Sequence, residues 1–475
     1  MNEKRVVIVG AGPAGLSAGW EILRAGRKVT ILERDPQHVG GLARTLCFNG
    51  HRFDIGAHRF FTMNPQIAHW WQDRLPNDFV RVKRLTRILY RGCLFHYPLQ
   101  AADSLRGLGF RSALTCCLSY AWRQWNPIQP EKSFEDWVSN RFGDKLYRTF
   151  FKTYTEKVWG MPCSKISADW ASQRIQGMSL GRAVLGAFGF RQSTIKTLAQ
   201  EFDYPRFGAG MMWERTRDEI TNMGGEVIMG KTVVKIERQN NRVESITTRA
   251  NDGTEHSWPV CECIVSMPLQ DCVLSMSPPL EESVQRAAGN LRYRDFVIVV
   301  LIVNQTQLFP DNWIYVHDPA VKVGRITDYN NWTKEMASNM TCLELEYFCS
   351  RGDTLWGMND PEILALARAE LKKLGLATAS EIVDGCVVRV EKAYPVYDRD
   401  YRQNVNVIRQ ALSKIENLHT IGRNGMHKYN NQDHSMLTGM LAARNVLGEN
   451  HDLWKVNTDC KYQDGERFAP VPIGE

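Results

Sequence analysis

The feature that most restricts how this chain can fold is a glycine-rich turn close to its start. Residues 10–15, GAGPAG, fit the pattern G-x-G-x-x-G. A β-branched strand is expected over residues 5–9, a helix over 16–25 and a second strand over 28–32. A turn of this kind between a strand and a helix is typical of a βαβ unit that binds a dinucleotide. The alternative is a strand–helix turn without a ligand.

Each residue of the turn has a task in such a unit. Gly10 allows the tight turn, Gly12 lets the backbone approach a pyrophosphate, and Gly15 lets helix and strand pack closely. Pro13 and Ala14 lie in the same turn, and the N-terminus of the helix that follows offers free N–H groups and a partial positive charge to a phosphate. These five residues are therefore expected to bind the cofactor.

The residues after the second strand extend this prediction. Glu33 stands 18 residues after Gly15, at a position where an acidic side chain accepts hydrogen bonds from a ribose diol. Glu33 and its neighbour Arg34 are both expected among the cofactor-binding residues. An acidic residue at this point does not by itself separate FAD from NAD.

Composition limits the class of protein. The chain has 475 residues, enough for two or three domains, and its net charge of +7 suits phosphates, anionic substrates or an anionic membrane surface. There is no basic tail or nucleic-acid motif, so no nucleic-acid partner is expected. The 12 cysteines contain no CxxC pair, which argues against a metal site. No apolar run approaches the ~20 residues of a membrane span, and no signal peptide is recognised, so a cytoplasmic protein is expected.

Five further segments resemble FAD enzymes of the amine oxidase and protoporphyrinogen oxidase superfamily. They are GGLAR at 40–44, FDIGAH at 53–58, TVVKI at 232–236, IVSMP at 264–268 and IGRNG at 421–425. The pattern of the last segment also predicts, independently of the resemblance, a strand, a turn and a helix N-terminus. Such a helix N-terminus would stabilise negative charge on a reduced flavin. The resemblance implies FAD as the cofactor.

The same resemblance implies where the cofactor lies. The second glycine pair would run along it, and the backbone of Val233 would meet its adenine. The further cofactor-binding residues expected from this resemblance are Gly41, Leu42, Ala43, Val233, Gly422, Arg423, Asp433, His434 and Ser435.

Within the superfamily, the chain is most similar to UDP-galactopyranose mutases, whose segments occur here in the family's order. These segments are GAHRFFT at 56–62, YTEKVWG at 154–160 with Arg174 behind it, LRYR at 291–294, YPVY at 394–397, and GRNG at 422–425 leading to YNNQDH at 429–434. Two departures stand out. Phe61 replaces the second histidine of the family's G-P-H-I-F-H-T segment, and Ala57 replaces its proline.

This similarity implies roles for the site residues. Arg174 and Arg294 would clamp the diphosphate of a sugar nucleotide, a task that suits the guanidinium fork. His58 would lie beside the flavin, and these three are the expected catalytic residues. The expected substrate-binding residues are Tyr154, Trp159, Arg174, Arg294, Tyr394, Tyr397 and Tyr429. The alternatives are surface ion pairs for the arginines, core packing for the aromatic residues and a structural role for the histidine.

We therefore expect a mixed α/β and α+β fold, in which a discontinuous Rossmann-type FAD-binding domain carries inserted substrate domains with an antiparallel sheet and helices. The predicted parts are an FAD-binding domain of 1–63, 205–270 and 405–450, a largely helical substrate or lid domain of 64–204, a β-rich substrate domain of 271–404 and a tail of 451–475. Predicted elements in the last half include strands at 226–229, 232–238, 242–249, 255–260, 263–266 and 418–422 and helices at 361–374, 403–416 and 435–447.

The segment 96–128 has no counterpart in the mutases and mixes Leu, Phe, Trp and Arg. One interpretation is the core of a helical domain. The other is an amphipathic surface that makes a peripheral contact with a membrane or a lipid-linked substrate.

Two enzymatic functions remain open on these grounds. The mutase resemblance implies a nucleotide-linked sugar as the small-molecule substrate, with the reduced flavin N5 as a nucleophile and no net redox change. The rival is an FAD-dependent oxidase or desaturase of the amine oxidase type, which needs an apolar tunnel or a cage of aromatic side chains. A flavin-binding scaffold without activity is the non-enzymatic alternative. Only one dinucleotide fingerprint is present, so the sequence leaves open whether an external reductant such as NAD(P)H reduces the flavin. The oligomeric state is open as well.

Overall fold

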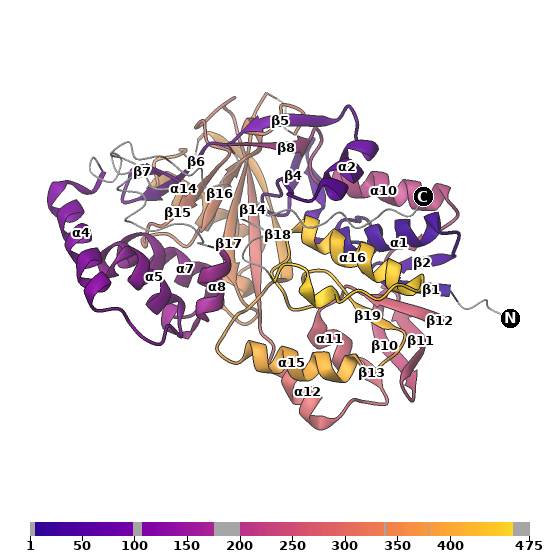
Figure 1. Cartoon of the computed structure of the whole chain (residues 1–475). Helices are drawn as coiled ribbons and strands as arrows, with labels where there is room; N and C mark the ends of the chain where they lie inside the picture. The colour runs from indigo at the N-terminus through magenta and orange to yellow at the C-terminus, as the bar shows by residue number, and fades with distance from the viewer. Residues whose placement is uncertain (1–4, 98–106, 175–199, 337–338, 379, 459–475) are drawn as a thin grey trace.

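The computed structural model describes residues 5–97, 107–174, 200–336, 339–378 and 380–458, with the side chains of 172–174 left out (Figure 1). The strands are β1 Arg5–Val9, β2 Val29–Leu32, β3 Thr45–Phe48, β4 His51–Asp54, β5 Phe79–Lys83, β6 Thr86–Tyr90, β7 Cys93–His96, β8 Glu201–Pro205, β9 Glu226–Ile228, β10 Thr232–Gln239, β11 Arg242–Arg249, β12 Glu255–Val265, β13 Met276–Ser277, β14 Tyr293–Val303, β15 Trp313–Val316, β16 Arg325–Asp328, β17 Thr341–Cys349, β18 Ile382–Pro395 and β19 Leu418–Thr420.

The helices are distributed along the chain between groups of these strands. They are α1 Pro13–Arg24, α2 Pro65–Arg74, α4 Phe110–Trp125, α5 Phe134–Phe142, α6 Asp144–Leu146, α7 Thr153–Trp159, α8 Ala168–Arg174, α10 Gly210–Asn222, α11 Leu269–Leu274, α12 Glu282–Gly289, α13 Thr354–Gly357, α14 Asp360–Lys373, α15 Tyr401–Leu412 and α16 Gln432–Val446.

The first large sheet contains the predicted βαβ unit. Its strand order is β13-β10-β11-β12-β1-β2-β9, and β19 adds to β12. Strands β1, β2, β9 and β19 run parallel to their neighbours, as crossover helices require, whereas β10 and β11 form an antiparallel extension. Helices α1, α10 and α16 cover one face, and α11, α12 and α15 lie on the other (Figure 1).

Strand β1 shows why this sheet is covered on both sides. Its four valine and isoleucine residues from Val6 to Val9 are all buried. Val6 and Ile8 pack in the apolar cluster with α1 and α16, and Val7 and Val9 pack in the cluster with α15. A continuous apolar run in a parallel strand is the pattern expected when both faces are buried.

One predicted break between two strands is absent from the structure. The sequence predicts two strands at 255–260 and 263–266, but β12 runs without a break over Glu255–Val265. Its first part, 255–259, pairs with β11, and residues from Val260 onward pair with β1. The polar break in the hydrophobic pattern therefore marks a change of partner strand, which local periodicity cannot distinguish from a strand end.

The second large sheet has the order β18-β14-β17-β16-β15-β6-β7 and is antiparallel except between β15 and β6. Strand β17 divides its side chains between two apolar clusters. Leu343, Leu345 and Tyr347 pack toward α14, while Cys342 and Phe348 face the first sheet's cluster. Glu344 and Glu346 alternate with the former group and lie on the same side as the latter, fully buried.

Helices α4–α8 form a lobe at one end of the molecule (Figure 1). This lobe has its own apolar cluster, which also receives Ile88 from β6 and Phe95 from β7. The segment predicted as largely helical thus also contributes strands β5–β7. The proposed division of the chain into domains stays a prediction.

Candidate functional site

The glycines between β1 and α1 differ in what surrounds them. A Cβ on Gly10, where φ is +98°, would lie 2.2 Å from Ser266 Oγ, and a Cβ on Gly15 would lie 1.9 Å from the carbonyl oxygen of Gly10. The protein itself needs glycine at both positions. Gly12 has φ −81° and ψ −177°, and the nearest atoms of the described residues to a Cβ there would lie 3.9 Å away. Alanine fits Gly12 in the protein alone, so the open backbone at this point suits a closely approaching ligand.

Glu33 lies directly beside this turn. Its Oε2 accepts a hydrogen bond from the N–H of Ala11 at 2.6 Å, and its Oε1 accepts one from the N–H of Asp35 at 2.8 Å. The N–H of Lys231 donates to the carbonyl oxygen of Glu33 at 2.7 Å, which brings the start of β10, with Val233, next to the carboxylate. The acid expected at a ribose and the strand expected at an adenine are therefore neighbours.

The second glycine pair packs against the first turn. The N–H of Gly40 donates to the carbonyl oxygen of Ala11 at 2.8 Å. A 3₁₀ turn over Gly41–Ala43 follows, and its first Cα lies 3.9 Å from the Cβ position of Gly12. Leu42 belongs to this turn. Arg34, by contrast, is exposed after β2.

The C-terminal segment closes the same region. A Cβ on Gly439 of α16 would lie 2.1 Å from the carbonyl oxygen of Ala14, and a Cβ on Gly422 would lie 3.2 Å from the Cβ of Ala14. Helices α1 and α16 thus cross at close range. Gln432, the first residue of α16, donates from Nε2 to the carbonyl oxygen of Arg59 at 3.1 Å, which ties this helix to the segment that carries His58.

The first turn of α16 carries Asp433, His434 and Ser435, all buried. A helix N-terminus favours negative charge. With the N-terminus of α1, the carboxylate of Glu33 and the open backbone at Gly12, the described residues fit an extended dinucleotide such as FAD. The role of each single residue stays a prediction.

A buried ion pair lies under the segment that follows β4. Arg325 on β16 donates from Nε to Glu346 Oε1 at 2.6 Å, and a Cβ on Gly56 would lie 3.4 Å from the guanidinium. Although burial disfavours the charged guanidinium, Glu346 raises the pKa of Arg325. Glu344 accepts from the N–H of Gly56 at 2.9 Å and from the hydroxyl of Tyr329 at 2.6 Å. These contacts fix the backbone just before His58.

His58 lies above this ion pair with a defined hydrogen bond. Its Nδ1 is 2.7 Å from the carbonyl oxygen of Gly56, so Nδ1 carries the proton and Nε2 is left as an acceptor. Burial, and then the positive charges of Arg423 and Arg325, lower the pKa of His58 to about 3. His58 is therefore a neutral imidazole near neutral pH.

A group of aromatic side chains from three parts of the chain lies near Arg423. Tyr394 of β18 and Tyr429, which precedes α16, stack with their ring centroids 5.6 Å apart and their planes at 17°. The Arg423 guanidinium carbon lies 4.8 Å from the ring centroid of Tyr429 and 5.6 Å from that of Tyr394. Trp159 is buried and contacts Tyr394 edge-on, with a centroid distance of 6.5 Å, and packs more closely on Trp170 at 4.8 Å.

Tyr154 on α7 completes this group. Its ring stacks on His317 with a centroid distance of 4.6 Å. Burial raises the pKa of Tyr154 well above its usual range, and Tyr315 adds to the shift while Arg325 opposes it. The phenol is therefore a neutral hydrogen-bond donor. The structure thus gathers His58, Tyr154, Tyr394, Arg423 and Tyr429 around the Arg325–Glu346 pair.

Three other predicted residues stand differently. Arg294 on β14 is buried and donates from Nε to the carbonyl oxygen of Val158 at 2.9 Å and from Nη1 to Ser350 Oγ at 2.6 Å. Tyr397 supports its neighbour, because its hydroxyl accepts from the N–H of Tyr429 at 2.8 Å. Arg174 ends α8, and its side chain lies outside the described residues. Their proposed roles at a substrate stay predictions.

Sequence reasoning did not single out Arg325, Glu344 and Glu346. The stretch LELEYF on β17 alternates apolar and acidic residues, a pattern that normally places the acidic side chains in water. Here both glutamates have no exposed surface. Two acidic side chains on one face of a strand need partners if that face is buried. A search for such partners in nearby segments could have found Arg325 and Tyr329, which supply them here.

The stack of His317 on Tyr154 gives a pH dependence to stability. Burial, followed by the charge of Lys157, lowers the pKa of His317 to about 3, against a usual value near 6.5 in the unfolded chain. Below pH ~6.5 the unfolded chain binds a proton that the folded protein does not, so the free energy of unfolding falls as the pH decreases. For one group this slope is up to about 1.4 kcal/mol per pH unit.

We expect His317→Phe, which keeps the ring contact, to reduce that slope. Urea unfolding of the wild type and the variant between pH 4.5 and 7 measures it. A variant whose unfolding free energy falls with acid as steeply as that of the wild type would show that His317 is not the group responsible.

Comparison with known proteins agrees with this geometry. The sequence profile described as "Flavin containing amine oxidoreductase" matches residues 13–447. A Klebsiella pneumoniae protein described as "Probable UDP-galactopyranose mutase" is 27% identical over 178 residues, 35% of this chain and 44% of the relative. An L-glutamate oxidase precursor of Streptomyces viridosporus is 48% identical over 82 residues, 17% of this chain and 12% of the relative. The chain therefore spans less than half the length of either relative.

Solved structures share the fold over nearly the whole chain. A crystal structure of reduced UDP-galactopyranose mutase has a TM-score of 0.84 at 20% identity and covers 98% of both chains. Putrescine oxidase bound to putrescine has a TM-score of 0.61 at 16% identity and covers 94% of this chain and 99% of that chain. At these identities the likeness concerns the fold, and it confirms the predicted mixed α/β architecture and the predicted resemblance.

Proposed function

The chain belongs to the flavin-containing amine oxidoreductase family and is a flavoenzyme, and on this basis we propose that it binds FAD and acts on a nucleotide-linked sugar with the flavin reduced. The bound flavin supplies the nucleophile for the anomeric carbon. The protein supplies the charges and hydrogen-bond donors that hold a diphosphate and a sugar in place.

The observation that carries this proposal is the polar, cationic character of the residue group around His58. Arg423 brings a guanidinium group to it, Arg325 brings a second one whose charge is paired with Glu346, and Tyr154 and Tyr394 bring neutral hydroxyls. A sugar diphosphate needs such donors, whereas an amine or a polyene does not. Neutral His58, with Nε2 free to accept, orients a hydroxyl or N–H group without adding charge.

One observation favours the second candidate, an oxidase of the amine oxidase type. The nearly parallel rings of Tyr394 and Tyr429 and the edge contact of Trp159 with Tyr394 make three aromatic side chains converge beside Arg423. Such a group also suits an amine or its oxidised product through its π faces. The family agrees with either function, and the relative described as an L-glutamate oxidase precursor agrees with the oxidase.

The experiment that separates the two uses purified protein with its flavin. Under anaerobic conditions, the dithionite-reduced and the oxidised enzyme are each incubated with UDP-galactopyranose, and products are separated by chromatography. We expect conversion only with reduced enzyme and no consumption of reductant. Absence of conversion, together with oxygen consumption on a panel of amines and amino acids, would support the oxidase instead. An external reductant such as NAD(P)H is tested by anaerobic bleaching of the flavin band.

Arg294 offers a test of the phosphate role. The contacts of Arg294 with Val158, Ser350 and Asp353 are made by Nε and Nη1, and Asp353 Oδ2 lies 3.6 Å from Nη1. Nη2 is therefore the nitrogen that we propose for a phosphate oxygen. We expect Arg294→Met to raise KM for the sugar nucleotide by about 30-fold or more, since a charge-assisted hydrogen bond to phosphate contributes roughly 2 kcal/mol. Steady-state kinetics measure it.

The matched control is Asp353→Asn, which removes the neighbouring charge and keeps an acceptor for the N–H of Ser350. Its KM should stay close to that of the wild type. An equal rise of KM in both variants would show that Arg294 acts by holding α7 and the Ser350 turn and not by binding phosphate.

A further inference from the structure

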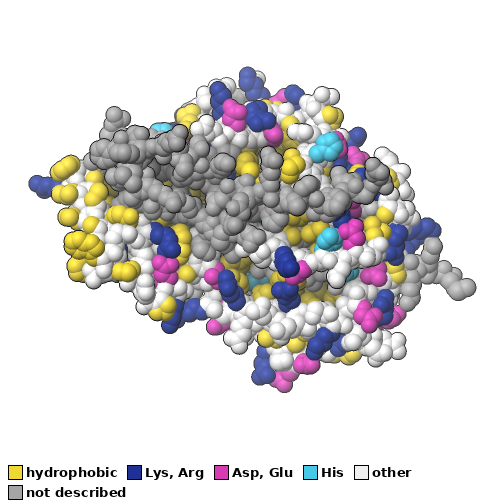
Figure 2. Space-filling view, viewed as in Figure 1, with side chains coloured by type: hydrophobic (Ala, Val, Ile, Leu, Met, Phe, Trp, Pro, Cys, Tyr) yellow, Lys and Arg dark blue, Asp and Glu magenta, His cyan; other side chains and the backbone are white. Residues whose placement is uncertain are grey.

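Helix α4 turns its large apolar side chains toward solvent. Phe110, Leu114, Leu118, Trp122 and Trp125 are 72%, 48%, 61%, 60% and 85% exposed. The first four follow at intervals of four residues and form one stripe along the helix. Figure 2 shows hydrophobic side chains gathered at the left edge, where Figure 1 places α4. Scattered single apolar residues on a surface are ordinary, but a stripe of this length is not.

The small and polar face of α4 is the one that packs on the protein. Cys116 is its only buried residue. Ser119 Oγ accepts from the N–H of Lys145 at 3.1 Å, and Arg123 Nε donates to Asp144 at 2.9 Å. Gly143 allows the close approach, since a Cβ there would lie 2.6 Å from the N atom of Tyr120. The orientation is therefore set by specific contacts, with the apolar face outward.

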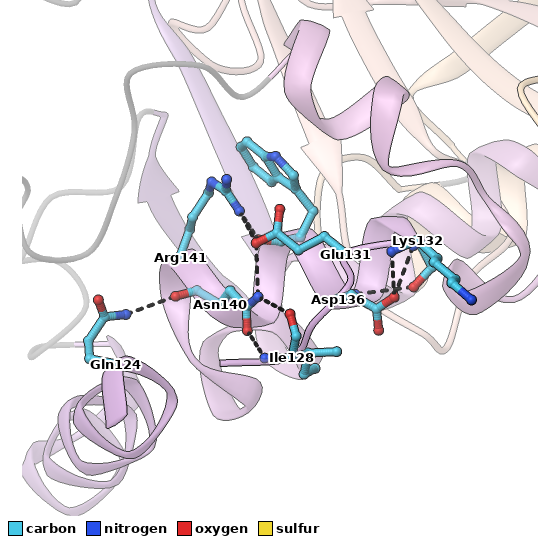
Figure 3. Close-up of polar contacts among 9 residues, drawn as sticks. Gln124, Ile128, Glu131, Lys132, Asp136, Asn140 and Arg141 are labelled. Carbon is cyan, nitrogen blue, oxygen red and sulfur yellow. Dashed lines mark hydrogen bonds and ion pairs between the residues drawn. The ribbon is translucent and has the colours of Figure 1, made fainter. Parts of the chain in front are cut away.

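A polar network fixes the C-terminal end of α4 in the same orientation (Figure 3). Gln124 donates from Nε2 to the carbonyl oxygen of Asn140 on α5 at 2.8 Å. The Asn140 side chain binds both backbone groups of Ile128, at 2.9 Å each. It also donates to Glu131, which in turn accepts from Arg141 at 2.7 Å. Rotation of α4 to bury its stripe would break these bonds.

Among the described residues, the exposed charged side chains of α4 and of residues 145–152 that have no ion pair are all positive. Residues 107–130 contain no Asp or Glu. Arg111, one residue into the helix, is exposed, and so are Lys145, Arg148 and Lys152 in the neighbouring turns. No ion pair is recorded for these four side chains among the described residues. A row of apolar and tryptophan side chains on a helix without acidic residues, in a lobe with exposed cations, suits the interface of an anionic bilayer.

We propose that α4 is a docking helix by which this protein binds the surface of an anionic lipid membrane. The stripe enters the headgroup region, and Arg111 with the cations of α6 and the following turn contacts lipid phosphates. Among the described residues no helix is long and apolar enough to cross a bilayer. A second copy of the chain is the weaker partner, because a two-fold dimer on this face would bring the two sets of cations together.

The test is flotation of the full flavin-loaded chain with vesicles of phosphatidylcholine alone or with 30% phosphatidylglycerol. We expect binding to the anionic vesicles, at least about ten-fold weaker binding to neutral ones, and a several-fold loss at high salt. Leu118→Glu with Trp122→Glu should reduce partition at least about ten-fold. The control Leu274→Glu changes a leucine that is 54% exposed on α11 and should bind like the wild type.

A second measurement does not depend on how the charged variant folds. Brominated lipids should quench part of the tryptophan fluorescence of the wild type, and Trp122→Phe with Trp125→Phe should remove most of that quenching while binding persists. Equal binding of wild type and the Leu118/Trp122 variant would overturn the proposal. So would absence of vesicle binding combined with a dimer that the same variant dissociates, since the stripe would then be a contact between copies.

Discussion

Gly12→Ala is expected to yield a folded protein that no longer retains its flavin. The added methyl group would lie 3.9 Å or more from every atom in the part of the chain that the structure describes, and φ and ψ of Gly12 suit alanine. It would, however, occupy the space through which a pyrophosphate reaches the backbone. We expect flavin affinity to fall about 100-fold or more, while the free energy of unfolding of the apoprotein changes by no more than about 1 kcal/mol. Flavin absorbance after gel filtration and urea unfolding of apoprotein measure the two effects.

Two other glycines supply the controls. Gly289→Ala at the end of α12 meets no atom within 4 Å and should leave both flavin content and stability near wild type. Gly15→Ala places a methyl group 1.9 Å from the carbonyl oxygen of Gly10 and should destabilise the apoprotein itself. Full retention of flavin by Gly12→Ala would contradict the dinucleotide site at this turn.

The second large effect concerns the Arg325–Glu346 pair. We expect Arg325→Met to lower the free energy of unfolding by about 3–5 kcal/mol, because it leaves a fully buried carboxylate without its counter-charge. Among the described residues Glu346 Oε2 has no hydrogen-bond partner, so none of them replaces the lost guanidinium. Urea unfolding followed by circular dichroism measures the change.

Removing both charges separates stability from activity. Arg325→Met with Glu346→Met should regain most of the lost stability, since replacing a buried ion pair by apolar residues is often close to neutral. It should still lack activity, because the guanidinium beside His58 is gone. Additive destabilisation by the two substitutions would falsify the description of Arg325 and Glu346 as one interacting pair.

The cofactor side of the candidate site was largely readable from the sequence. Gly10–Gly15 and the C-terminal segment at Gly422 are local motifs that each join a strand end to a helix start, and Glu33 directly follows a strand. The structure brings them together through Ala11, Glu33 and Ala14. The family match confirms the predicted resemblance and fold. Local motifs can predict a phosphate site because the backbone N–H groups of a single turn are what contact a phosphate.

The substrate side was only partly readable. Tyr154 stands more than 200 residues before Tyr394 and Tyr429, and only the resemblance predicted that the three belong to one site. Glu346 was missed because alternation on β17 is the ordinary sign of a solvent-exposed face, and its partner Arg325 on β16 was missed with it. The environment of a side chain depends on what covers its face of the sheet, and that is a property of the packed fold.

By itself the sequence determined the βαβ start, the apolar strands and the dinucleotide turn, because these depend on the period of hydrophobic residues and on backbone geometry at glycine. Only the tertiary structure decided that Glu344 and Glu346 are buried and that the apolar stripe of α4 faces outward. The sequence of segment 96–128 favours the core of a helical domain over an amphipathic surface, but amphipathicity gives the two faces of a helix and not the side on which its neighbours lie. Gly143, Asp144 and Asn140 settle it by holding the polar face of α4 and its C-terminal end.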